Sequence, residues 1–189
     1  MKVPVEVSAR HVHLSEVDIK SLFGDGYNPN HKRNLSQPEQ FVCEERVELV
    51  GPKSSFGSVA ILGPARSQTQ VEISLTDSRK LGIDPFIRES GDLKGTPGCI
   101  LRGPRGEVEI KSGVIVAKRH IHMHTSDAEK IGAENGQICK VKINSKERSL
   151  IFDDVVMRVS DKFALAMHID TDEGNAVNWD INTSGNIIL

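Results

Sequence analysis

Two segments of this 189-residue chain repeat one pattern, and that repeat constrains the fold more than any other feature of the sequence. In the first copy an alternating apolar segment, residues 3–7, runs into Arg-His-x-His and then into a short helical stretch. In the second copy residues 113–117 run into Arg-His-x-His in the same way. Two copies in a chain of this length predict two similar β domains of roughly 100 residues or fewer each. A functional site shared between the two domains is the natural expectation.

The periodicity of the chain is mainly that of β-strands. The helical segments are short, and each is followed by a glycine, which is typical of a helix C-terminus; they cover residues 16–23, 77–81 and 126–131. Residues 24–40 are rich in turn formers and form the longest predicted loop. Many short strands at close spacing predict a mostly β fold of small barrels or sandwiches rather than alternating β-α units. The predicted strands cover residues 3–7, 46–50, 58–62, 70–75, 99–102, 107–111, 114–117, 138–143, 149–152, 155–159 and 163–169.

Charge and composition exclude several classes of protein. With 24 basic and 26 acidic side chains, the chain lacks the basic excess of a nucleic-acid-binding protein. No apolar run approaches the 18 or so residues of a membrane span, and the N-terminus shows no signal-peptide core. The three cysteines, Cys43, Cys99 and Cys139, are scattered among strand-like residues, so we expect buried thiols rather than disulfides or a cysteine-rich metal site. Together these features predict a soluble cytoplasmic protein.

Histidines are concentrated in the two repeat copies. Five of the seven belong to two clusters, His11 with His13, and His120 with His122 and His124. In a strand, residues i and i+2 lie on the same face about 6.6 Å apart, so two imidazoles can converge on one ion. One such pair alone would be an unremarkable surface feature, but two pairs at equivalent points of a repeat indicate metal binding.

Imidazole with carboxylate is a donor set that suits Zn²⁺ first, and Fe²⁺, Co²⁺ or Ni²⁺ after it. The two pairs, one carboxylate and His168 would suffice for two ions with open coordination positions, which are typical of a catalytic site. His168, which ends an apolar strand, could equally be a core or capping residue. His124 continues the second pair, but its counterpart in the first copy is Ser15, so its role as a ligand is left open.

Five further side chains carry expectations of their own. Arg66 lies in a turn, and an arginine beside a metal site could bind a phosphate or carboxylate bidentately. Taken alone, however, Arg66 resembles a solvated charge and Glu72 an exposed strand residue. Arg10 and Arg119 directly precede the two histidine pairs and point to the opposite strand face, where we expect them to pair with acids. The remaining histidine, His31, is expected to be solvated.

Five segments, in order over nearly the whole chain, resemble the PduL-type phosphate acyltransferases, the phosphate propanoyltransferases associated with bacterial microcompartments. The matching segments are residues 8–24, 35–47, 63–92, 117–123 and 152–176. The resemblance implies two β-barrels capped by short helices with a two-zinc active site between them. It also implies one barrel from residues 1–9 with 118–189 and another from residues 10–117. The implied reaction is the reversible conversion of acyl-CoA and inorganic phosphate into acyl phosphate and CoA.

The resemblance also implies roles for particular residues. Arg66 would bind phosphate, and Ser8, Arg33, Leu62 and Asn175 would line the CoA cleft. We hypothesise that phosphate attacks the thioester directly, because neither a Ser-His-Asp pattern nor a reactive cysteine is evident. The implied ligands of two zinc ions are His11, His13, Glu72, His120, His122 and His168.

Two other functions are weighed against this one. The first is a dinuclear zinc hydrolase, a thioesterase or phosphoesterase, and the second is a non-enzymatic β-barrel binding module with structural metal. The acyl group is propanoyl or acetyl by resemblance. Microcompartment members of the family often carry an N-terminal amphipathic extension that this chain lacks, so association with a microcompartment stays open, as does a homodimer.

Overall fold

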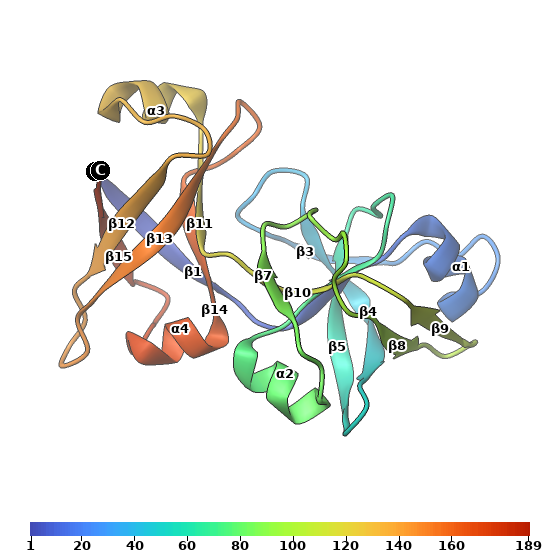
Figure 1. Cartoon of the computed structure of the whole chain (residues 1–189). Helices are drawn as coiled ribbons and strands as arrows, with labels where there is room; N and C mark the ends of the chain where they lie inside the picture. The colour runs from blue at the N-terminus through green and yellow to red at the C-terminus, as the bar shows by residue number, and fades with distance from the viewer. The chain divides into compact units, whose positions relative to one another are not determined.

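The computed structural model describes residues 1–189, and the chain divides into two compact units (Figure 1). Unit 1 comprises Met1–Ala9, Ser36–Pro38 and Lys118–Leu189. Unit 2 comprises Arg10–Leu35 and Glu39–Ala117. The chain therefore begins in unit 1, passes through unit 2 with a brief return to unit 1 at residues 36–38, and ends in unit 1.

Unit 1 is a closed barrel of strands with two short helices. Around the barrel the strands follow the order β1-β14-β11-β13-β12-β15. β1, the blue strand in Figure 1, pairs parallel with β14 and antiparallel with β15, so the N-terminal strand completes a barrel otherwise made by the C-terminal part of the chain. The elements are β1 (Lys2–Ser8), β11 (His120–Met123), α3 (Thr125–Ile131), β12 (Ile138–Ile143), β13 (Leu150–Val159), β14 (Ala166–Asp170), α4 (Thr171–Ala176) and β15 (Ser184–Ile188).

Alternating side chains of these strands fill the barrel. Val5 of β1 and both Ile121 and Met123 of β11 are buried in one apolar cluster. Side chains alternate between the two faces of a strand, so the residues next to these apolar ones in the sequence point away from the cluster. In β11 those residues are His120 and His122. Packing of the apolar core thus determines which face presents the histidines.

Unit 2 is a nine-stranded sheet with two short helices. Its strands follow the order β7-β10-β6-β2-β5-β4-β8-β9, and β3 pairs with β4 off this path. A second apolar cluster, which includes Val12 and Leu101, forms the core. The elements are β2 (His11–His13), α1 (Glu16–Phe23), β3 (His31–Asn34), β4 (Phe41–Val50), β5 (Ser55–Gly63), β6 (Gln70–Glu72), α2 (Leu75–Leu81), β7 (Phe86–Arg88), β8 (Cys99–Arg102), β9 (Glu107–Ile110) and β10 (Val114–Ala117).

The predicted mostly β class is confirmed, and one of the two expected barrels is present as a closed barrel. In unit 1, β15 pairs with both β1 and β12 and thereby closes the ring. In unit 2, β8 pairs with β4 and β9 but not with β10, so the sheet ends at β7 and β9. The second barrel of the expected pair is therefore not confirmed.

The strand predicted over residues 70–75 is wrong at its C-terminal end. The strand stops at Glu72, and the Ser74 side chain accepts a hydrogen bond from the backbone N–H of Asp77 at 3.2 Å. Ser74 is thus the N-cap of α2, which begins at Leu75 rather than at residue 77. This early start places Asp77 in the first turn of the helix.

Other segments also differ from the sequence-based expectation. The strand predicted over residues 163–169 begins only at Ala166, as β14. The strands predicted at 149–152 and 155–159 are one strand, β13, which continues through Asp154 at a φ of 53°. The predicted loop over residues 24–40 contains the short strand β3. Helix α4 was not expected, yet Asp170 and Glu173 form a reciprocal capping box at its start.

The helix ends follow the sequence signals. Gly82 and Gly132 end α2 and α3 in the left-handed conformation, at φ values of 75° and 68°. Ser15 caps the N-terminus of α1, and His124 caps that of α3. None of the helices has the length and apolar character needed to cross a membrane.

Candidate active site

The two His-x-His segments form short strands of the same kind. β2 carries His11 and His13 on either side of Val12, which is 0% exposed. β11 carries His120 and His122 on either side of Ile121, which is also 0% exposed. Within each pair the imidazole rings lie close, with centroids 5.0 Å apart in β2 and 4.7 Å apart in β11. The predicted convergence of each histidine pair is therefore present.

A third potential ligand lies directly across from the first histidine of each pair. Glu72 of β6 is the antiparallel partner of His11, and His168 of β14 is the antiparallel partner of His120. Directly opposed residues in an antiparallel pair project to the same face with their Cβ atoms about 5 Å apart. Strand register thus brings each third side chain to its histidine pair.

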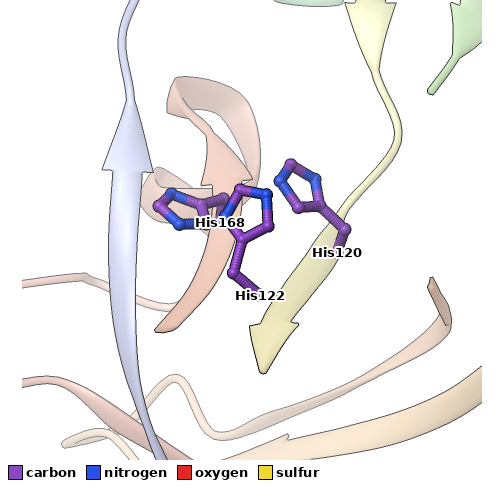
Figure 2. A group of neighbouring side chains, drawn as sticks. All are labelled: His120, His122 and His168. Carbon is purple, nitrogen blue, oxygen red and sulfur yellow. The ribbon is translucent and has the colours of Figure 1, made fainter. Parts of the chain in front are cut away.

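Two groups of three donors result, one in each unit. In unit 2 the Glu72 carboxylate lies 3.5 Å from His11 Nε2 and 3.9 Å from His13 Nε2, forming what we call the His–His–Glu group. In unit 1 the rings of His120 and His122 lie 5.2 and 4.9 Å from that of His168, forming the three-histidine group. Figure 2 shows these three rings converging from β11 and β14. In both groups the potential ligand atoms lie within 4.8 Å of one another.

Hydrogen bonds determine the tautomers of two of these histidines. His120 Nδ1 lies 2.8 Å from the carbonyl oxygen of Lys118, which can only accept, so Nδ1 carries the proton and the lone pair is on Nε2. His13 Nε2 accepts a hydrogen bond from Arg66 Nη2 at 3.0 Å, so this nitrogen carries the lone pair, and a metal ion bound there would take the place of the hydrogen bond. These are the tautomers in which Nε2 binds a metal ion.

The electrostatics of the His–His–Glu group favour its metal-binding protonation states. Burial is the main cause that holds the pKa of His13 well below its usual range, and electrostatic interactions with His11 and Arg66 lower it further. Burial alone would raise the pKa of Glu72, but His11, His13 and Arg66 outweigh it and lower that pKa. At neutral pH His13 is therefore neutral and Glu72 is ionised, as a metal site requires.

Both groups fit a divalent ion by their donor chemistry. His11, His13 and Glu72 could hold one ion, and His120, His122 and His168 could hold another. Three protein ligands that leave a fourth position open are the usual arrangement of catalytic zinc. The six ligands expected from the sequence thus lie in two groups of three, one in each unit.

Arg66 lies beside the His–His–Glu group and has a second anchor. In addition to its contact with His13, its Nη1 donates to Ser90 Oγ at 3.1 Å. The Arg66 backbone N–H donates to the carbonyl of Leu14 at 2.9 Å, which fixes the turn next to β2. A guanidinium held in this way can bind an anion bidentately next to the metal ligands.

Sequence reasoning missed Gln70, which is 1% exposed and orients Glu72. Its amide nitrogen lies 2.5 Å from Glu72 Oε1 and 2.9 Å from Ser90 Oγ, and its carbonyl accepts from the Gly91 N–H at 2.8 Å. The signal was available, because residues two apart in a strand share a face. Ser90 and Gly91 had no comparable signal, since they come from a distant loop.

Glu6 was also missed. Its carboxylate lies 3.8 Å from His168 Nδ1 and accepts a hydrogen bond from Ser36 Oγ at 2.6 Å. Register explains the contact, since Glu6 and His168 are parallel partners in β1 and β14. The resemblance implied one barrel from residues 1–9 with 118–189, but no sequence pattern indicated which strand of that barrel would pair with β1.

Neither remaining histidine belongs to a triad. His124 Nδ1 accepts from the backbone N–H of Ser126 at 3.2 Å, so this ring serves as the N-cap of α3. His31 is exposed, and its Nε2 lies 2.6 Å from Asn34 Oδ1. The exposure of His31 agrees with the expectation of a solvated side chain.

The four residues expected to contact CoA are divided between the units. Ser8 ends β1 and Asn175 lies in α4, both in unit 1. Arg33 of β3 and Leu62 of β5 lie in unit 2, where each is a cross-strand partner of Val42 in β4. Arg33 is exposed and Leu62 is partly buried.

Known proteins resemble the chain over almost its entire length. A family model described as phosphate propanoyltransferase matches residues 4–180. The chain is 54% identical over 186 residues to the phosphate propanoyltransferase of Listeria monocytogenes, covering 98% of this chain and 87% of the relative. For the phosphate propanoyltransferases of Thermotoga maritima and Alkaliphilus metalliredigens, the identities are 53% over 172 residues and 52% over 188 residues. These alignments cover 91% and 100% of this chain, and 82% and 88% of the respective relatives. The chain therefore belongs to the phosphate propanoyltransferase family of acyltransferases.

Proposed function

We propose that this protein is a zinc-dependent phosphate acyltransferase. It converts propanoyl-CoA or acetyl-CoA and inorganic phosphate reversibly into the acyl phosphate and CoA. One zinc ion binds the His–His–Glu group and a second binds the three-histidine group. The names of its relatives support the reaction class, and the donor chemistry of the two triads supports zinc.

One observation carries the proposal beyond the family name. Arg66 Nη2 lies 3.0 Å from His13 Nε2, so a cation suited to phosphate is next to a triad suited to metal. Phosphate is a weak nucleophile towards a thioester, and its negative charge must be neutralised before it can approach. When bound, the zinc ions supply Lewis-acid chemistry that offsets this charge and polarises the thioester carbonyl.

Arg66 binds the phosphate and holds one of its oxygens towards the acyl group. Ser90 anchors Nη1 of the guanidinium, and Nη2 is oriented towards the metal ligands. Ordering phosphate in this way lowers the entropic cost of bringing two substrates together, which is a large part of the barrier to such reactions. A phosphate oxygen then forms a bond to the carbonyl carbon. The C–S bond breaks with its electron pair on sulfur, and CoA leaves as a thiolate. The phosphate releases its proton to solvent as the acyl phosphate forms, and the thiolate takes up one proton from solvent, so the step balances.

The buried thiols support attack by phosphate itself. Burial raises the pKa of Cys99 to about 12, and it is the main cause that raises the pKa values of Cys43 and Cys139 to about 11. A thiol that is buried and protonated at neutral pH is a poor acyl carrier. We therefore infer a single displacement without an acyl-cysteine intermediate.

Ser8, Arg33, Leu62 and Asn175 are the proposed contacts of CoA. The exposed guanidinium of Arg33 suits the phosphate groups of this cofactor, and Leu62 on the other side of Val42 suits its apolar portions. We also propose a cytoplasmic location. All three cysteines are free, which is typical of a reducing compartment.

The test is release of free thiol from propanoyl-CoA and from acetyl-CoA, with and without phosphate, before and after chelation of metal. We expect release that needs both phosphate and metal, with restoration by zinc. The faster substrate then identifies the acyl group. Initial rates over a grid of the two substrates should give intersecting lines, whereas parallel lines would indicate an acyl-enzyme.

Three outcomes would overturn the proposal. Thiol release that does not need phosphate would identify a thioesterase. Full activity after complete removal of metal would show that metal bound to the two triads is not needed for catalysis. The absence of turnover with either substrate, in a sample shown to contain two zinc ions, would favour a metal-containing binding module.

A further inference from the structure

An arginine–carboxylate pair accompanies each of the two triads, and the two pairs occupy equivalent positions. Arg10 directly precedes His11, and Arg119 directly precedes His120. Their partners, Asp77 and Glu173, each follow the third ligand of the triad by five residues. The same order of arginine, histidine pair, third ligand and carboxylate therefore occurs twice, with a carboxylate as the third ligand in one unit and an imidazole in the other.

In unit 2 the pair is bidentate and largely buried on its acidic side. Arg10 Nε donates to Asp77 Oδ2 at 2.9 Å, and Nη2 donates to Oδ1 at 2.7 Å. Asp77 is 4% exposed, and the Arg10 guanidinium lies 4.2 Å from the centroid of the Phe56 ring. Two parallel hydrogen bonds and a stacked ring fix the direction of this arginine.

In unit 1 the same three side-chain types meet. Arg119 Nε lies 2.8 Å from Glu173 Oε1, and its guanidinium lies 5.3 Å from the centroid of the Phe152 ring. The other carboxylate oxygen of Glu173 accepts the backbone N–H of Asp170 in the capping box of α4. The arginine is thus tied to the first turn of a helix, as Arg10 is tied to the first turn of α2.

Each pair joins the strand of the two histidines to the segment that carries the third ligand. Asp77 and Glu173 both lie three residues after the N-cap of the helix that directly follows the third-ligand strand. Only three residue pairs connect β2 with β6, and only three connect β11 with β14. Because these ladders are so short, they constrain the ends of the strands weakly. The ion pairs add a second attachment on the strand face opposite the ligands.

We propose that Arg10–Asp77 and Arg119–Glu173 are positioning pairs that hold the third ligand of each triad at coordinating distance from its two histidines. This inference rests on the proposed function, since it assumes that both triads bind metal. The arginines are not themselves among the proposed metal ligands. Their effect is exerted through the separation of β2 from β6 and of β11 from β14. Loss of a supporting residue around a metal site typically lowers metal affinity by about 10- to 100-fold.

The experiment measures zinc affinity separately for the two triads by competition with a chromogenic chelator. The variants are Arg10→Gln in unit 2 and Arg119→Gln in unit 1. We expect Arg10→Gln to weaken one of the two zinc sites by about 10- to 100-fold and to leave the other unchanged, with the converse for Arg119→Gln. Adding Glu72→Ala to each variant removes a ligand from the His–His–Glu group. Any effect of the arginine substitution that remains in the double variant then belongs to the three-histidine group. Cobalt substitution gives an independent readout, because a displaced ligand changes the visible spectrum.

Arg102→Gln is the matched control. Arg102 pairs with Glu107 at 3.0 Å on the surface of unit 2, and its strand β8 lies three strands from β2 in the sheet, so its loss should leave both zinc affinities unchanged. Unfolding of the metal-free variants in urea measures stability separately. A purely structural role would lower stability without this selectivity between the two sites. If a glutamine variant does not fold, Arg10→Lys and Arg119→Lys keep the charge but lose the paired donors, and they should still show the selective loss.

The outcomes separate this inference from the proposed function. If the unaltered protein binds no zinc, the proposed function fails and this inference fails with it. If it binds two ions but the folded arginine variants bind them within twofold of the normal affinity, only the positioning role is overturned. Equal weakening of both sites by either variant would likewise overturn it.

Discussion

Glu72 lies directly across from His11 in the antiparallel pair of β6 and β2, with its Oε2 3.5 Å from His11 Nε2. The corresponding residue in unit 1 is a neutral imidazole, His168. A divalent ion on the His–His–Glu group would therefore keep one fewer positive charge than an ion on the three-histidine group. Arg66 lies beside the His–His–Glu group, 3.0 Å from His13, so its positive charge offsets the negative charge of the Glu72 carboxylate.

Replacing Glu72 by Gln should lower the bound zinc from two ions per chain to one. The amide is a much weaker metal ligand than the carboxylate, and the two remaining histidines cannot form a stable three-ligand site. Metal analysis after gel filtration measures this. The control is Glu107→Gln, at a carboxylate that only pairs with Arg102 on the surface. Two ions bound to Glu72→Gln would exclude this residue as a ligand.

Replacing Arg66 by Gln should raise the KM for phosphate and lower kcat/KM for phosphate by about 10- to 100-fold, since a charge-assisted hydrogen bond contributes roughly 1.5–3 kcal/mol. Arg66→Lys should recover only part of this loss, because lysine lacks the planar pair of donors. Zinc content should stay at two ions per chain in both variants. A KM for phosphate equal to that of the unaltered enzyme would contradict the assigned role.

Replacing Gln70 by Glu should weaken the zinc site of the His–His–Glu group. The change puts an oxygen acceptor where an amide donor now lies 2.5 Å from Glu72 Oε1, so two carboxylates would face each other in a buried site. We expect a loss of about 1–3 kcal/mol in the free energy of unfolding, measured in urea without metal. Gln68→Glu is the control, because Gln68 is exposed and donates only to Ser112. Similar effects of the two substitutions would contradict a specific role for Gln70.

Acid should destabilise the metal-free protein in two stages. Burial lowers the pKa of His13 from 6.5, so the unfolded chain binds a proton that the native protein does not, and stability falls as the pH drops below about 6.5. Burial opposes a low pKa at Glu72, but His11, His13 and Arg66 lower it on balance from 4.5, so more stability is lost below about pH 4.5. Urea unfolding at several pH values, with a chelator present, measures both stages.

His13→Asn separates these two contributions. Asparagine does not titrate, so the slope of unfolding free energy against pH between about 6.5 and 5 should become shallower in this variant. The stage below about pH 4.5 should persist, because Glu72 is still present. An unchanged slope between pH 6.5 and 5 would show that other groups cause the first stage.

The three cysteines should react slowly with a thiol reagent in the native protein. Cys43, Cys99 and Cys139 are free and buried, and burial is the main cause of their raised pKa values. At pH 8 with Ellman's reagent we expect little reaction over minutes, and three thiols per chain after addition of denaturant. Rapid reaction of one thiol in the native state would reveal a reactive cysteine and reopen the question of an acyl-enzyme.

Local sequence signals predicted much of the secondary structure and some of the site. The two histidine pairs stood out because period-2 spacing puts both rings of a pair on one face of a strand. Glycines located the ends of α2 and α3 correctly. The strand predicted over residues 70–75 was too long, because its alternation continues past Glu72 into residues that Ser74 caps as a helix.

The sequence by itself determined the mostly β class, the presence of two His-x-His strands and, through resemblance, the family. Tertiary structure decided which third side chain meets each pair, because Glu72 and His168 reach the histidines through strand register. Tertiary structure also brought Ser90 to Arg66 and Glu6 to His168 across 24 and more than 100 residues of chain, respectively. Periodicity is a property of neighbouring residues and can be detected in one strand, whereas register depends on how whole strands pack around a shared core.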